Sequence, residues 1–241
     1  MKRQIVIFSG FNRCQFNPQP KPGEKHRVLT EEWIAWRFYI WRKYTWNSIL
    51  NQSYTQWKYC LLCDSEARKL TDKYFGNIKD KRFYILYYQT PEEKQLMEKI
   101  AAGSDEIVNV RCDSDDCYHK QAISELVETI KTNPSEFYQF VGGYGYEYKK
   151  EGFGELFYYN PKHKSGPFFA HCYTRYNWLK QGTIQEPQHK SIRSKRPIVI
   201  DKRLILVGLH ENTSTTMGMG CFRGRIEGQQ KINTLLQFGI K

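Results

Sequence analysis

The most informative stretch of the sequence is Ile107-Val108-Asn109-Val110-Arg111-Cys112-Asp113-Ser114-Asp115-Asp116. Its first four residues are largely apolar and predict a short buried strand. Three carboxylates then follow within four positions, at 113, 115 and 116. Ligands of open α/β sheets bind beyond the carboxyl ends of the strands, so the sequence predicts that these carboxylates lie at a binding edge.

Two interpretations of this acidic turn stay open at the level of sequence. Asp113 and Asp115 are two positions apart, which in a turn lets both reach one ion, and Mg²⁺ or Mn²⁺ prefers such oxygen ligands. A cation or the neighbouring Arg111 would relieve the repulsion between the carboxylates. The other interpretation is a helix N-terminus, which Asp favours with or without a metal. The glycine and the closing glutamate of a calcium-binding loop are missing.

The first half of the chain alternates strand and helix four times, which predicts a parallel sheet with right-handed crossovers. Thr30 is a good N-cap, and Thr90-Pro91-Glu92-Glu93 has the composition of a capping box with proline at the first helical position. The expected strands are 5–8, 57–63, 83–88 and 107–110, and the expected helices are 30–50, one from 65, 91–103 and one between 116 and 133.

The second half changes character, because short strand-like runs are separated there by Gly, Asn and Pro. We expect these runs to form an antiparallel extension of the same sheet. The fold class predicted for the whole chain is therefore α/β, with a mostly parallel central sheet flanked by helices. The runs are 137–141, 144–150, 155–159 and 168–173.

The composition of the 241 residues excludes several classes of protein. Aromatic residues make up 15% of the chain, which excludes intrinsic disorder. No apolar run approaches the ~20 residues that span a bilayer, and the apolar stretch at 5–8 is too short for a signal peptide, so a cytoplasmic location is expected. The 7 cysteines are then expected to be free thiols, mostly in the core.

The formal net charge of +12 favours a polyanionic partner over solubility alone. Nucleic acid, an anionic membrane surface and phosphorylated small molecules all fit, and residues 189–197 hold four Lys or Arg in nine positions. A non-enzymatic nucleic-acid-binding protein would explain this charge but not the clustered carboxylates. Walker, dinucleotide-binding and nucleophile-elbow motifs are missing, whereas a metal-dependent phosphatase or nuclease remains an alternative.

Three further observations concern stretches that follow one another along the chain. The first runs from Trp33-Ile34-Ala35-Trp36-Arg37 to Asn51-Gln52-Ser53, and the second is Arg111-Cys112-Asp113-Ser114-Asp115-Asp116. The third is Ser165-Gly166-Pro167-Phe168-Phe169, followed by His189 and by His210-Glu211-Asn212-Thr213-Ser214. In this order the three stretches resemble GT-A-type glycosyltransferases, and more narrowly the rhamnosyltransferase-like group of bacterial and phage enzymes.

The resemblance implies a GT-A-like single domain over residues 1–241 with an antiparallel C-terminal extension. Residues 1–135 would bind a UDP-, TDP- or GDP-linked sugar, and residues 136–241 would bind the acceptor and complete a site for Mn²⁺ or Mg²⁺. The surplus of basic residues leaves two classes of anionic acceptor, either a cell-envelope glycan or hydroxymethylated phage DNA.

The resemblance also implies roles for individual residues. Asp64 would accept a hydrogen bond from a pyrimidine ring, although it could equally cap the helix after it. Arg111 would contact phosphate or balance the acidic turn. The residues implied to bind the metal are Asp113, Asp115 and His210, with His189 as the competing ligand. Those implied to bind the donor are Arg13, Asp64, Arg111, Asp113 and Asp115, and those implied to bind the acceptor are Ser165, Pro167 and Phe168. The implied catalytic base is Asp116 or Glu211.

Overall fold

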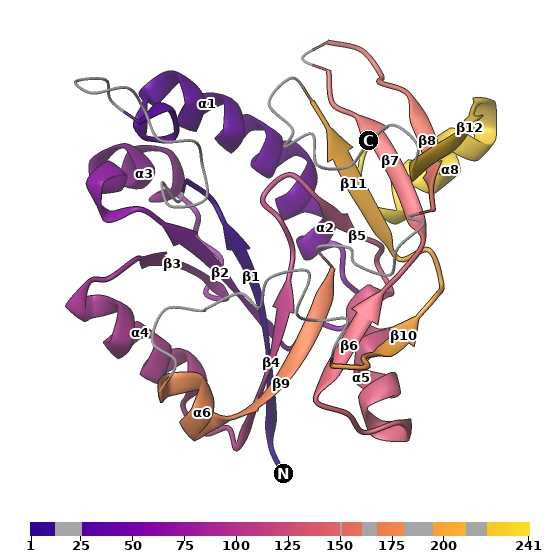
Figure 1. Cartoon of the computed structure of the whole chain (residues 1–241). Helices are drawn as coiled ribbons and strands as arrows, with labels where there is room; N and C mark the ends of the chain where they lie inside the picture. The colour runs from indigo at the N-terminus through magenta and orange to yellow at the C-terminus, as the bar shows by residue number, and fades with distance from the viewer. Residues whose placement is uncertain (13–25, 150, 161–167, 181–194, 211–220) are drawn as a thin grey trace. The chain divides into compact units, whose positions relative to one another are not determined.

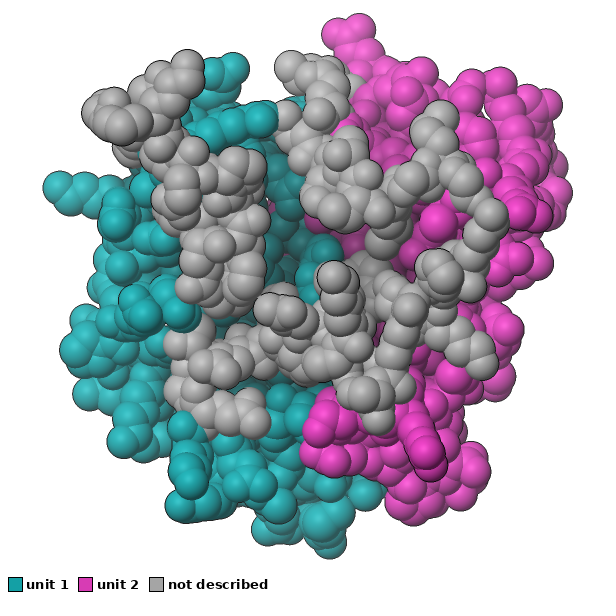
Figure 2. Space-filling view, viewed as in Figure 1, with its two compact units in different colours: residues 1–39, 56–114, 171–186 teal, residues 40–55, 115–170, 187–241 magenta. Residues whose placement is uncertain are grey.

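The structure is a computed structural model that describes residues 1–12, 26–149, 151–160, 168–180, 195–210 and 221–241. The chain forms two compact units, coloured separately in Figure 2. Unit 1 contains Met1–Tyr39, Gln56–Ser114 and His171–Glu186. Unit 2 contains Ile40–Thr55, Asp115–Ala170 and Pro187–Lys241. Each unit is therefore assembled from three separate stretches of sequence.

Unit 1 is built on four parallel strands in the order β4-β1-β2-β3, which confirms the predicted parallel α/β sheet. Residues 5–9 of β1 are all buried, as expected for an inner strand that is covered on both faces. The register places Ile7 of β1 beside Tyr59 of β2 and Val110 of β4. The strands are β1 (Arg3–Gly10), β2 (Trp57–Cys63), β3 (Phe83–Tyr87) and β4 (Glu106–Arg111).

Helices cover both faces of this sheet (Figure 1). On one face, α4 and α6 lie side by side, and Met97 and Trp178 join a buried cluster with Val6 and other strand residues. On the other face, Phe75 of α3 stacks on Phe83 of β3, with ring centroids 6.3 Å apart. The helices are α1 (Glu31–Ile40), α3 (Arg68–Phe75), α4 (Pro91–Ala101) and α6 (Arg175–Lys180), with 3-10 turns at Arg27–Leu29 and Ser65–Ala67.

The helix starts agree with the capping signals in part. The hydroxyl of Thr30 accepts a hydrogen bond from the amide of Trp33 at 3.4 Å, so Thr30 caps α1 as predicted. Helix α4 begins at Pro91 as predicted, but Thr90 makes no side-chain capping bond, so the predicted capping box is incomplete.

Unit 2 contains a mixed five-stranded sheet of order β12-β8-β7-β11-β5. β7 pairs antiparallel with β8, as expected, but β11 lies parallel to β7 on its other side. The predicted extension is therefore wrong for two of its four runs, 144–150 and 155–159: as β7 and β8 they belong to this second sheet, because they pair with late strands of the chain. The strands of unit 2 are β5 (Cys117–Tyr118), β6 (Phe137–Phe140), β7 (Gly143–Glu147), β8 (Leu156–Tyr159), β10 (Ile198–Ile200), β11 (Ile205–Leu209) and β12 (Phe222–Ile226).

Two further strand features complete the description. β6 pairs in parallel with β10, a strand that the sequence analysis did not predict. β9 (Phe169–Thr174) begins among the residues of unit 2 and ends among those of unit 1.

The helix predicted for residues 30–50 is present, but its middle is π-helical at Trp41–Thr45 before α2 begins. Helix α5 begins only at Ala122, so the acidic turn is not a helix N-terminus, and that interpretation is wrong. The helices of unit 2 are α2 (Trp46–Leu50), α5 (Ala122–Thr132) and α8 (Gly228–Gln237). Within the part of the chain that the structure describes, no helix combines the length and apolar character that a membrane crossing requires.

Candidate functional site

The acidic turn is fixed at its start to the inner strands of unit 1. The amide of Cys112 donates to the carbonyl of Phe8 at 3.0 Å, and the hydroxyl of Ser9 donates to the carbonyl of Cys112. The hydroxyl of Tyr59 in turn donates to Ser9 Oγ at 2.6 Å. The turn therefore leaves the sheet at the carboxyl end of β4, where the sequence analysis expected it. Ser9 and Tyr59 were not predicted, because a buried hydroxyl on an inner strand follows no local pattern.

Two guanidinium groups hold the unit 1 side of the turn. Arg111 pairs with Asp113, with Nε 2.9 Å from Oδ1 and Nη2 3.3 Å from Oδ2. Arg37 Nη2 donates to Ser114 Oγ at 2.6 Å. Both arginines are less than a tenth exposed. Guanidinium groups bind phosphate oxygens well, so this side of the turn suits an anion.

A carboxylate–imidazole pair begins the unit 2 side of the turn. Asp115 Oδ2 lies 3.0 Å from His210 Nε2, and the imidazole is completely buried. The His210 ring is parallel to the ring of Tyr148, with an interplanar angle of 6°. Tyr148 also stacks on Tyr44 with ring centroids 3.8 Å apart. The two tyrosines thus restrict the orientation of the imidazole against Asp115.

A buried thiol lies behind this pair. Cys117 Sγ is 3.4 Å from the hydroxyl of Tyr148. Burial raises the pKa of the Cys117 thiol to about 12 and raises the pKa of Tyr148 well above its usual value. Both groups therefore stay protonated near neutral pH, and neither adds a negative charge beside Asp115.

We expect Cys117 in the native protein to resist iodoacetamide at pH 8, while the half-buried Cys172 and Cys221 react. The thiolate is the reactive form, and a pKa of about 12 leaves roughly one Cys117 thiol in ten thousand ionised at pH 8. Mass spectrometry of the peptides after timed labelling measures this, with the protein in guanidinium chloride as the control in which all sites react. Labelling of native Cys117 as fast as Cys221 would contradict the described burial.

Asp116 and Gly208 connect the turn to β11. Asp116 Oδ1 accepts a hydrogen bond from the amide of Gly208 at 3.0 Å, and Asp116 is only 4% exposed. This burial and this contact favour a structural role for Asp116 over the predicted role as catalytic base. A Cβ atom at Gly208 would lie 2.1 Å from the carbonyl oxygen of Asp115 and 2.3 Å from the Tyr148 ring. Only glycine therefore allows β11 to approach the turn.

Of the three predicted metal ligands, the structure brings together Asp115 and His210, while Asp113 is engaged by Arg111. Among the described residues there is no group of three or more His, Cys, Asp or Glu side chains that could hold a metal ion. Asp115 and His210 still offer a carboxylate oxygen and an imidazole nitrogen, a donor set that suits Mn²⁺ better than Ca²⁺.

A second polar group lies where β1 and β2 end. Asp64 Oδ1 accepts from the amide of Glu66 at 3.0 Å, so the capping interpretation of Asp64 is confirmed. The amide of Asp64 donates to Asn12 Oδ1 at 2.9 Å. Asn12 is fully buried, and its Nδ2 has no hydrogen-bond partner among the residues that the structure describes. Buried donors rarely stay unpaired in native proteins, so Nδ2 is a candidate contact for a ligand.

Six predicted residues remain, and Phe168 is the one among them that the structure describes. Arg13, Ser165, Pro167, His189 and Glu211 lie outside the described residues. Phe168 is described, is completely buried, and packs edge-on against Tyr118 with ring centroids 5.5 Å apart. This position in the core of unit 2 argues against the predicted contact between Phe168 and an acceptor.

No protein-family model matches the sequence, and no curated protein matches it. Among solved structures, the chain is similar to S. aureus TarS 1-349 in complex with UDP-GlcNAc, at 13% identity and a TM-score of 0.45. That alignment covers 88% of this chain and 59% of the TarS chain, so this chain spans less than two thirds of its length.

Two other similar structures are matched over most of their length. One is described as a nucleotide-diphospho-sugar transferase from Desulfovibrio desulfuricans G20, at 11% identity, with 88% of this chain and 89% of that chain covered and a TM-score of 0.36. The other is 4-diphosphocytidyl-2C-methyl-D-erythritol synthase, at 12% identity, with 83% and 90% covered and a TM-score of 0.37. These similarities concern the course of the chain alone.

Proposed function

We propose that this chain is a glycosyltransferase that moves a sugar from a nucleotide-diphosphate donor to an acceptor hydroxyl. One observation supports this most strongly: successive residues of one turn engage two buried arginines and a buried histidine. Arg111 and Arg37 hold Asp113 and Ser114, and Asp115 then meets His210. A diphosphate leaving group gains negative charge as the glycosidic bond breaks, and fixed cations such as the two guanidinium groups lower the energy of that transition state.

The polar groups at the ends of β1 and β2 would bind the nucleotide base. The ring N–H of uracil, thymine or guanine lies next to a ring carbonyl. The carboxylate of Asp64 could accept from such an N–H, and Asn12 Nδ2 could donate to the neighbouring carbonyl. Arg111 and Arg37 would then contact the diphosphate with charge-assisted hydrogen bonds. This assignment keeps UDP-, TDP- and GDP-linked donors open.

Asp115 and His210 are the residues that would hold Mn²⁺ or Mg²⁺. When bound, such an ion neutralises charge on the phosphates of the donor. The stacked Tyr148 fixes the imidazole plane, and the close approach at Gly208 fixes the backbone of Asp115. Asp113 is assigned instead to holding Arg111 in place for the phosphates.

The proposal for the acceptor rests on the sequence motifs and on the charge of the chain. Residues 136–241 would bind an anionic acceptor, either a cell-envelope glycan or hydroxymethylated DNA, which agrees with the net charge of +12. Glu211 stays the predicted base that takes the proton of the acceptor hydroxyl, since Asp116 is buried. The same motifs support the narrower proposal of a rhamnosyltransferase-like enzyme within a single glycosyltransferase domain.

Thermal denaturation with UDP-, TDP- and GDP-sugars, with and without Mn²⁺, tests the proposed function. Ligand at a hundred times its dissociation constant stabilises the native state by about 2.7 kcal/mol. For a chain of this size we therefore expect the melting temperature to rise by roughly 5–10 °C with one donor class. The rise should require Mn²⁺ and should be lost in Arg111→Lys, because lysine cannot reproduce the forked contact.

The control is Arg225→Lys, which changes an exposed arginine of β12 in the same chemical way. This variant should keep the full temperature shift. If no nucleotide-sugar raises the melting temperature but oligonucleotides do, the chain is a nucleic-acid-binding protein and the proposed transferase activity is wrong.

A further inference from the structure

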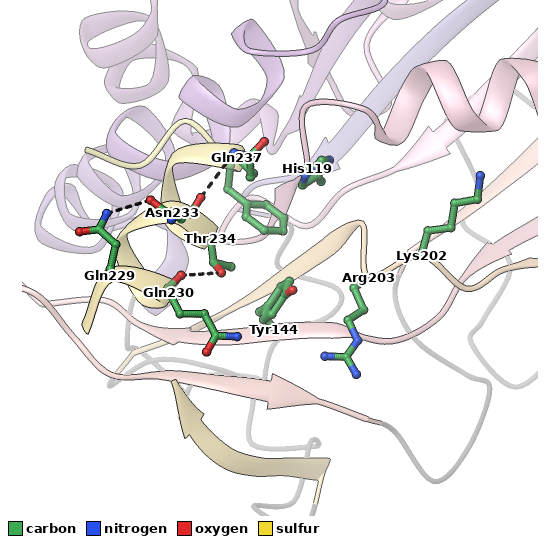
Figure 3. Close-up of a pocket in the computed structure, with 10 residues that line it drawn as sticks. His119, Tyr144, Lys202, Arg203, Gln229, Gln230, Asn233, Thr234 and Gln237 are labelled. Atoms are coloured by element: carbon green, nitrogen blue, oxygen red, sulfur yellow. Dashed lines mark hydrogen bonds between the residues drawn. The ribbon is translucent and has the colours of Figure 1, made fainter. Parts of the chain in front are cut away.

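Unit 2 contains a pocket of about 550 Å³ that lies apart from the acidic turn. Figure 3 shows side chains of α8 along one wall, together with Tyr144 of β7 and the residues that precede β11. The volume is within the range of pockets that bind small molecules. The residues that carry the following argument are Tyr144, Lys202, Arg203, Gln230, Asn233 and Gln237.

Side-chain amides dominate the helical wall of this pocket. Gln230, Asn233 and Gln237 are three and four residues apart, so they share one face of α8. Gln230 Nε2 donates to the hydroxyl of Tyr158 at 3.0 Å, and Asn233 Oδ1 accepts from Gln229 at 2.9 Å. The Oε1 atom of Gln230 and the Nδ2 atom of Asn233 remain for a ligand, one acceptor and one donor. Such a combination matches hydroxyl groups, which both donate and accept.

Aromatic rings form another part of the lining. Tyr144 meets Phe238 edge-on, with ring centroids 5.9 Å apart and an interplanar angle of 80°. This contact holds the Tyr144 ring in place and leaves it partly exposed. A fixed aromatic ring beside a row of amides offers an apolar surface for the C–H groups of a ligand and polar contacts at its edge.

One cation of the pocket is without a neutralising carboxylate. Lys202 Nζ lies 2.5 Å from Glu125 Oε2, so these two side chains form an ion pair. Arg203 instead lies over the ring of Tyr158, 4.7 Å from its centroid, and makes no ion pair with any carboxylate of the described residues. Its φ of 54° is in the left-handed region, which residues other than glycine adopt rarely. The pocket therefore fits one acidic group.

Within unit 2, the pocket and the Asp115–His210 pair are at opposite ends of β11. Arg203 precedes the strand and His210 follows it, and its five residues extend roughly 16 Å. A ligand in the pocket is therefore separate from a donor held at Asp115 and His210. A chain of linked units could nevertheless extend from one place to the other.

We propose that this pocket binds one anionic sugar unit of a glycan acceptor, at a distance from the transfer site. Arg203 binds the phosphate or carboxylate group, the amides of α8 bind the hydroxyls, and Tyr144 lies against the sugar ring. The description of the glycan as the acceptor rests on the proposed function, whereas the binding of the sugar unit does not. A single unpaired arginine among amides suits such a unit better than a DNA backbone, which needs a series of cations.

Calorimetric titration tests the proposal with four probes: a hexose 6-phosphate, the neutral hexose, inorganic phosphate and a duplex oligonucleotide. The hexose phosphate should bind, and the neutral hexose and inorganic phosphate should each bind at least about tenfold more weakly, because each lacks one half of the contacts. Equal binding of inorganic phosphate would mean that the pocket recognises only an ion. Displacement of the hexose phosphate by the oligonucleotide would assign the pocket to nucleic acid, and no binding of any probe would also overturn the proposal.

One variant and two controls locate the binding. Arg203→Asn should weaken the binding of the hexose phosphate at least about tenfold. Because asparagine tolerates the left-handed backbone conformation, this variant should keep the fold. Arg223→Asn, at an exposed position of β12, should bind as the wild type does. Asp115→Asn should also bind normally, because the pocket does not include it. If the pocket binds but no nucleotide-sugar raises the melting temperature, the proposed function fails and the pocket assignment stands.

Discussion

Replacement of Asp115 by asparagine is expected to lower the rate of sugar transfer by about a hundred- to a thousandfold while the protein stays folded. The asparagine side chain has nearly the same size and can still hydrogen-bond His210, so the stacked rings stay in place. It has no negative charge, however, and is a poor ligand for a divalent cation. Loss of one fixed group that stabilises charge in a transition state typically costs this much.

Initial rates with saturating donor and Mn²⁺ measure the effect, with Asp201→Asn as the matched control. Asp201 is an exposed aspartate of unit 2, and its replacement should leave the rate unchanged. His210→Gln should lower the rate by a similar factor. The rate of the double variant should be little lower than that of either single variant, because the two side chains act as one unit. A wild-type rate in Asp115→Asn, or fully multiplicative losses in the double variant, would remove the pair from the mechanism.

Replacement of Gly208 by alanine is expected to have the largest effect on stability. The added methyl group would lie 2.1 Å from the carbonyl oxygen of Asp115 and 2.3 Å from the Tyr148 ring. Backbone and a stacked ring cannot move without breaking the contact between Asp116 and the Gly208 amide. Overpacking of this kind lowers the free energy of unfolding by about 3 kcal/mol, and the melting temperature should therefore fall by roughly 6–12 °C.

The control for this prediction is Gly152→Ala. Gly152 has a φ of 70°, and a Cβ atom there would meet nothing within 4 Å. Its replacement should lower the free energy of unfolding by only about 1 kcal/mol, which is the strain of the left-handed backbone. Melting curves of the two variants separate crowding from backbone strain. Equal temperature shifts would show that the close approach at Gly208 is unimportant.

The parallel sheet of unit 1 could be predicted because its strands are short and continuously apolar. β1 is buried on both faces, so five successive residues are apolar or small, and no competing helical period appears. β12 shows why other elements were missed. Three of its five residues are exposed, among them Arg223 and Arg225, and its hydrogen-bonding partner β8 lies more than sixty positions earlier. Nothing local in Phe222–Ile226 indicates a strand.

The candidate site, like the fold, was predictable only in part from the sequence. The carboxylates of the acidic turn stand together in the sequence, and their place after a strand indicates a binding edge. Their partners do not stand together: Arg37 is 77 positions from Ser114, and His210 is 95 positions from Asp115. Tyr148 and Gly208 reach the turn through strand pairing in unit 2. The resemblance pointed to His210, whereas its first stretch contained Arg37 without giving this residue a role.

The π-helical stretch at Trp41–Thr45 has a consequence for engineering. It includes Tyr44, whose ring stacks on Tyr148 and so supports the imidazole of His210. A π-helical turn has one residue more than an α-helical turn and is less stable, and such turns persist mostly where function needs them. Removal of one residue would regularise the helix but rotate Tyr44 away from the stack. The proposed activity therefore depends on this less stable helical turn, and attempts to stabilise the chain should leave these five residues unchanged.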